Sequence, residues 1–143
     1  MTHRIRISGP ATAWQHFPND REAEEITDRE RLPYFAGIAY RRESMCDYLR
    51  DGPDTLALAD IGLTGGYIAL DYDRASNALI AVTEYAAPRA LNAQELDALT
   101  DCTRGQWSDG TGSNFGQSFA VATRVSIDIM LSPEEVKVEQ MRA

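Results

Sequence analysis

The chain has 143 residues, of which 43% are hydrophobic and 25% charged, with 10 glycines and 6 prolines. This length indicates one domain over residues 1–143, and this composition excludes disordered, collagen-like and fibrous classes. The formal net charge of −8, shared evenly by the two halves of the chain, excludes the basic footprint of a nucleic-acid binder.

The first predicted element is a strand over residues 3–8. Ile5 and Ile7 alternate there with polar residues, which is the period of a strand with one wet face. Gly9 and Pro10 follow and are expected to end the strand.

The next predicted elements are less regular. Residues 18–31 are dominated by charge and indicate a solvated helix or an ordered loop. Residues 34–50 fit both a strand and a helical stripe, and a strand followed by a helix is favoured. Residues 50–53, Arg-Asp-Gly-Pro, end that element, and residues 54–65 form a short apolar segment that ends in glycine.

Two runs rich in β-formers, 67–72 and 78–85, predict a hairpin with a polar loop at 73–77. A helix is predicted over 93–104. Asn92 has the pattern of an N-cap, and Glu95 stands three positions later, as in a capping box. Gly105 is expected at the position just after the helix.

The last predicted elements follow a polar connection. Residues 119–130 alternate apolar and polar side chains, which predicts a strand. Ser132 and Pro133 predict the start of a short C-terminal helix, although Val136 and Val138 alternate as in a strand. Together the elements predict an α+β domain with a mainly antiparallel sheet of about four to five strands and two to three helices.

Residues 105–117, GQWSDGTGSNFGQ, form the first candidate site. This connection concentrates polar side chains, glycines and two aromatic rings between the predicted helix and strand. The candidate ligand-binding residues are Gln106, Trp107, Ser108, Asp109 and Asn114. A structural Ω-loop, with the Trp107 ring in the core, is the competing interpretation.

The stretch Gly105-Gln106-Trp107-Ser108-Asp109-Gly110 resembles a G-Q-x-S-D-G signature of small uncharacterised bacterial and phage-related proteins. The resemblance covers about a dozen residues and implies a fold family without an activity.

Motifs of common enzymes are missing from the sequence. Gly110-Thr111-Gly112 lacks the third glycine and the preceding strand of a dinucleotide fingerprint, and Asn114 stands where a calcium loop needs glycine. Cys46 and Cys102 form no metal-ligand cluster, and Cys102 is expected to be a structural residue on the apolar side of its helix. No cofactor and no metal are therefore expected.

Two functions of different classes remain. The first is a protein-binding or regulatory module of the inhibitor or immunity type, in which acidic groups attract a basic protein partner. The second is a small-molecule-binding protein or enzyme with its site at 105–117, where Asp109 acts as acid, base or cation ligand. The sequence leaves enzyme status open. A bacterial, cytoplasmic protein without nucleic-acid or membrane partners is expected, and a homodimer through a strand edge is compatible with it.

Overall fold

The computed structural model describes residues 2–17, 21–36, 44–46, 49, 56–108, 114–118 and 126–142, with the backbone alone at 56, 108, 114–118 and 126. Seven strands within these ranges form one sheet, in which β3, β4, β1, β6 and β5 follow one another and β2 and β7 also pair with β1. Every strand pairing within these ranges is antiparallel. The predicted α+β class with a mainly antiparallel sheet is confirmed, and the sheet has more strands than expected.

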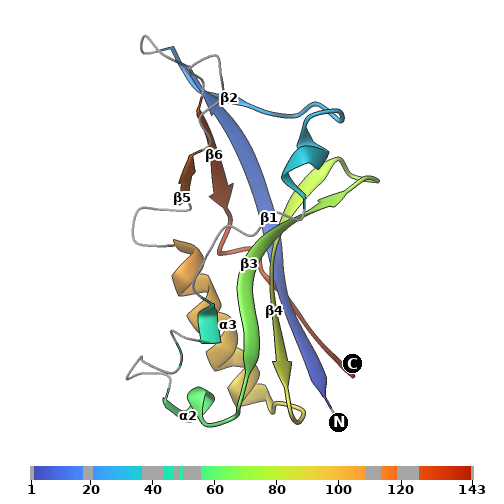
Figure 1. Ribbon diagram of the computed structural model, residues 1–143, viewed down its shortest axis with the longest axis vertical. Helices are drawn as coiled ribbons and strands as arrows, with labels where there is room; N and C mark the ends of the chain where they lie inside the picture. The colour runs from blue at the N-terminus through green and yellow to red at the C-terminus, as the bar shows by residue number, and fades with distance from the viewer. Residues whose placement is uncertain are drawn as a thin grey trace.

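The long strand β1 (His3–His16) organises this sheet (Figure 1). On one side it pairs with β4 (Ala78–Ala87) and then with the two-residue β2 (Glu24–Glu25). On the other side it pairs with β7 (Lys137–Arg142) and then with β6 (Ser126–Leu131). One strand therefore connects both ends of the molecule.

The sheet buries one face, which we call the inner face. Odd-numbered residues of β1 point to this face, and Ile5, Ile7 and Ala13 among them are fully buried. The helix α3 (Ala93–Ser108) covers this face. The buried hydroxyls of Tyr85 on β4 and Thr103 on the helix share a 2.7 Å hydrogen bond. Figure 1 shows α3 beside the lower half of β3 (Thr64–Asp73), with the short α2 (Leu56–Ala59) at its end.

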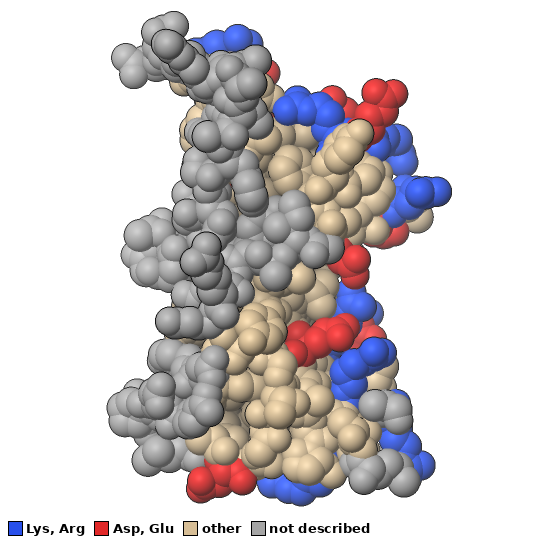
Figure 2. All heavy atoms as spheres, in the orientation of Figure 1, with Lys and Arg blue, Asp and Glu red and all other residues tan. Residues whose placement is uncertain are grey.

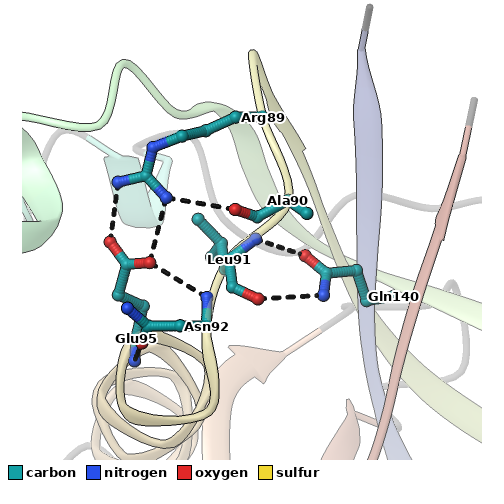
Figure 3. Close-up of polar contacts among 6 residues, drawn as sticks. All are labelled: Arg89, Ala90, Leu91, Asn92, Glu95 and Gln140. Carbon is teal, nitrogen blue, oxygen red and sulfur yellow. Dashed lines mark hydrogen bonds and ion pairs between the residues drawn. The ribbon is translucent and has the colours of Figure 1, made fainter.

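The start of α3 is fixed by polar contacts that Figure 3 shows. The Oδ1 atom of Asn92 accepts a hydrogen bond from the backbone N–H of Glu95, and the Glu95 carboxylate accepts one from the N–H of Asn92. This is the predicted capping box. Gln140 of β7 holds the residue before the cap with two hydrogen bonds. Its side-chain oxygen accepts from the N–H of Leu91 at 2.7 Å, and its side-chain nitrogen donates to the Leu91 carbonyl at 3.1 Å.

The end of α3 differs from the prediction. The helix runs through Gly105 to Ser108 instead of ending at residue 104. Gly105 has no positive φ, so it does not form the left-handed cap that the sequence suggested. The buried ring of Trp107 explains the longer helix, because its contacts with the sheet stabilise one more turn.

The predicted end of the first strand at Gly9-Pro10 is also wrong, because β1 continues to His16. The carbonyl of Pro10 accepts a hydrogen bond from Ser132 N, so the Pro10 nitrogen also faces the side of β6 and β7. On that side β6 has ended and β7 has not begun. A proline, which has no N–H to donate, therefore removes no hydrogen bond from the ladder.

The C-terminal segment is the third correction. Residues 133–135 form turns, and β7 follows where a short helix was predicted. The alternation of Val136 and Val138 was the better signal, because Val138 pairs with Ile7 of β1. A helix could not pair in this way with the backbone N–H and C=O groups along the edge of β1.

The remaining elements follow the sequence more closely. The hairpin is confirmed, with β3 and β4 paired around residues 74–77. The strand predicted at 119–130 is β6 from residue 126 onward, and 119–125 lie outside the described residues. Residues 21–31 are extended or turn, and the predicted strand after residue 34 falls on the 3-10 helix η1 (Leu32–Phe35) and on residues outside the described ranges. The described residues 45, 46 and 49 are helical, as expected.

Candidate functional site

The structure places four of the five candidate residues of the 105–117 connection, and they lie on two different elements. Gln106 is a half-buried residue in the last turn of α3, and Ser108 ends that helix. Asn114 begins β5 (Asn114–Ser118), opposite Met130 of β6. Asp109 lies outside the described residues. The proposed acid, base or ligand role of Asp109 stays a prediction.

Trp107 is part of the core. Its side chain is fully buried, and its indole N–H donates a 3.1 Å hydrogen bond to the buried hydroxyl of Thr83. The ring also lies against Gly9 of β1, where an added Cβ atom would meet its Cζ3 atom at 3.0 Å. The Trp107 indole thus lies in the core, as the Ω-loop interpretation expects for this ring. It presents no stacking face to solvent.

The opposite face of the sheet, which we call the outer face, is open. It carries the even-numbered residues of β1 and β4 and their neighbours on β3, β6 and β7. Among the described residues on β1 and β4 that point this way, only Ser8 and Val82 are buried. A sheet face covered by a second layer would bury most of its side chains.

A hollow formed by described residues lies on the upper half of this outer face. It has a volume of about 550 Å³, within the usual range of binding pockets. We call it the Trp14 groove. Its lining is mostly apolar and includes Pro10, Thr12, Trp14, His16, Asp128, Met130 and Glu135.

Two carboxylates flank Trp14: Asp128 lines the groove, and Glu25 lies beside it on the neighbouring strand. The register places Glu25 of β2 directly opposite Trp14 on one side and Asp128 of β6 directly opposite it on the other. Directly paired residues of antiparallel strands project on the same face, with Cβ atoms about 4.5–5.5 Å apart. The indole is half-buried, and its N–H donates to Thr12 Oγ1 at 2.9 Å, which orients the ring.

Asp128 also contacts His16, whose Nε2 lies 2.7 Å from Asp128 Oδ2. The two side chains are 45% exposed for His16 and 21% exposed for Asp128, so the pair lies at the solvent edge of the groove. Glu25 forms no ion pair with a described residue. The groove therefore keeps a net negative rim around an aromatic ring.

Charge elsewhere on the described surface is mixed. Figure 2 shows basic and acidic side chains interspersed along one side of the molecule, with no broad area of one sign among the coloured residues. Arg6 pairs with Asp71 at 3.2 Å and Lys137 with Glu139 at 3.3 Å on the lower half of the outer face. Asp71 and Glu139 on the lower half are thus paired within the protein.

The Trp14 groove has little signal in the sequence. Pro10 has the usual signal of a strand end, and this signal obscures the alternation of Ala11 and Ala13 with Thr12 and Trp14. That alternation is a strand signal, and extending it would have placed Trp14 on the polar face. The pairing with Glu25 and Asp128 joins distant parts of the sequence and has no local signal.

The cysteines show no reactive arrangement in the described chain. Cys46 and Cys102 form no disulfide and are partly buried, and burial raises the pKa of the Cys102 thiol to about 11. A thiol with so high a pKa is a poor nucleophile at neutral pH. The described residues include no group of three or more metal-ligating side chains and no helix long and apolar enough to cross a membrane.

Comparisons with protein-family models, with curated proteins and with solved structures gave no match to this chain.

Proposed function

We propose that this protein is a binding module that docks a basic partner protein on the outer face of its sheet, in the manner of a small inhibitor or immunity protein. The observation that carries the proposal is the open face itself. It combines half-exposed apolar side chains, Trp14, Ile80 and Met130, with the carboxylates around the groove.

This combination suits protein recognition. Interfaces are anchored by a few buried aromatic residues within a polar rim, and Trp14 has the size and partial exposure of such an anchor. The net charge of −8 adds long-range attraction for a basic protein and raises its rate of association. Binding would act by occlusion, since the module covers a surface of its partner.

A photo-crosslinking experiment tests the proposal. A benzophenone amino acid is placed at Glu84, which is exposed on the outer face, and in a matched protein at Asp97, which is exposed on α3. We expect a basic protein to be cross-linked from Glu84 and not from Asp97. The yield is expected to fall between about 50 and 300 mM salt, because salt screens the charges that steer association.

Three outcomes would contradict the proposal. Equal cross-linking from both positions would mean nonspecific contact, and cross-linking that is unchanged by salt would exclude electrostatic recognition. Absence of any specific product at Glu84 in the native cell lysate would contradict outer-face docking as well.

A further inference from the structure

We infer that the Trp14 groove is the anchor site for a cationic side chain, arginine in particular, of the basic partner. The inference rests on the proposed function and adds the place and chemistry of the central contact.

The first step is the shape and lining of the groove. Trp14, Met130 and Pro10 supply an apolar floor in a hollow of about 550 Å³. An arginine side chain has an aliphatic stem that packs on such a floor, and its planar guanidinium stacks on the face of an aromatic ring. The groove offers contacts for both parts of that side chain.

The second step is charge. Glu25 and Asp128 stand on the two sides of Trp14, so a cation above the indole has a carboxylate on either side. His16 bonds Asp128 Oδ2, and no described residue bonds the Oδ1 atom. That oxygen and the Glu25 carboxylate are left to accept hydrogen bonds from a guanidinium.

The third step is the contrast with the rest of the same face. Around the lower half, Asp71 and Glu139 already pair with Arg6 and Lys137. A cation arriving there would compete with the protein's own basic groups. At the Trp14 groove, by contrast, an aromatic ring lies beside two carboxylates that no described lysine or arginine pairs with, and charge complementarity selects a cationic occupant over an acidic or an aliphatic one.

The test uses N-acetyl-arginine N-methylamide as the probe and follows the two tryptophan indole N–H signals by NMR. The Trp14 signal is expected to shift on titration while the buried Trp107 signal stays in place and reports an intact core. The citrulline analogue has nearly the same shape without charge. It is expected to bind at least about fivefold more weakly, as loss of the cation–π and ionic contacts predicts.

Variants locate the site. Glu25→Gln and Asp128→Asn are each expected to weaken probe binding by about two- to fivefold. Glu139→Gln is the matched control: it removes a carboxylate from the same face opposite Arg6, eight residues from Trp14 along β1, or about 27 Å, and is expected to change nothing. Glu25→Gln leaves the contact between His16 and Asp128 unchanged. Weaker probe binding by this variant therefore reports the loss of the Glu25 carboxylate alone.

The inference is overturned if the Trp14 signal does not move with the arginine probe, or if citrulline moves it equally. It is overturned too if both groove variants bind like the wild type. Cross-linking at Glu84 that survives such a result would leave the proposed function standing without this anchor. Probe binding in the absence of any cross-linked partner would keep the cation site and reject the proposed function.

Discussion

Gly9 and Gly105 are two glycines in opposite surroundings, the first closely packed and the second open. A Cβ atom on Gly9 would meet Trp107 Cζ3 at 3.0 Å and the backbone oxygens of Glu135 and Ser132 at 3.2 and 3.3 Å. A Cβ on Gly105 would meet nothing within 4 Å, and the residue is exposed within α3. Gly9 lets the indole rest directly on the sheet, whereas Gly105 only lowers the helix propensity of its segment.

Alanine at these two glycines should therefore change stability in opposite directions. We expect Gly9→Ala to lower the free energy of unfolding by about 1–3 kcal/mol, because rigid backbone and a buried ring must move. We expect Gly105→Ala to raise it by about 0.5–1 kcal/mol through helix propensity. Urea unfolding of both variants measures the difference. An equal loss in the two would mean that the close contact at Gly9 has no energetic weight.

At the scale of elements, the first turn of α3 has a built-in pH dependence. Arg89 donates two hydrogen bonds to the Glu95 carboxylate at 3.0 and 2.8 Å, and the N–H of Asn92 donates a third (Figure 3). These bonds, the Arg89 contact above all, lower the pKa of Glu95 from 4.5 to about 2. A carboxyl group with a depressed folded-state pKa stabilises the fold above its unfolded pKa.

The Glu95 contribution should be fully present above about pH 4.5 and lost as the pH falls toward about 2. We expect Glu95→Gln to be less stable than the wild type at neutral pH, with the difference shrinking through that window. Thermal unfolding from pH 7 to pH 2 measures it, and Asp97→Asn, an exposed position on the same helix, is the control. A difference that is constant with pH would show that the charge of Glu95 does not act at the cap.

The elements also show which features a sequence can predict. The capping box of α3 and the hairpin of β3 and β4 are encoded by neighbouring residues, and both were predicted correctly. Two local signals are misleading. Pro10 on its own indicates the end of a strand, and the segment after Ser132 on its own indicates the start of a helix. Their actual conformations depend on each other, across some 120 positions, through the bond from Ser132 N to the Pro10 carbonyl.

The candidate site also depends on contacts between residues that are far apart in the sequence. Trp107 is conspicuous in the sequence as an aromatic residue among polar ones, yet its ring belongs to the core. Trp14 gave a weaker signal, and its meaning comes from Glu25 and Asp128, which only strand pairing brings beside it. Tertiary pairing therefore determines which of the two tryptophans faces a ligand.

At the scale of the whole molecule, β1 connects every part of the sheet that the structure describes except β3 and β5, which reach it through β4 and β6. Ile7 lies near the middle of its core-facing side and is fully buried. Trp14 lies toward one end on the outer face and Trp107 on the inner side. A strand shared in this way should make unfolding of the two ends a single cooperative event.

Truncation of Ile7 tests that cooperativity. We expect Ile7→Ala to lower the free energy of unfolding by about 2–5 kcal/mol, because it leaves a cavity under α3. Val138, which pairs with Ile7 on β7 but is 37% exposed, is the matched site, and Val138→Ala should cost well under that amount. With 5-fluorotryptophan in the protein, the two fluorine signals report Trp14 and Trp107 separately. Both should shift to the same lower urea midpoint in Ile7→Ala, whereas a Trp14 signal that keeps its original midpoint would show that the end of β1 carrying the groove folds independently of the core.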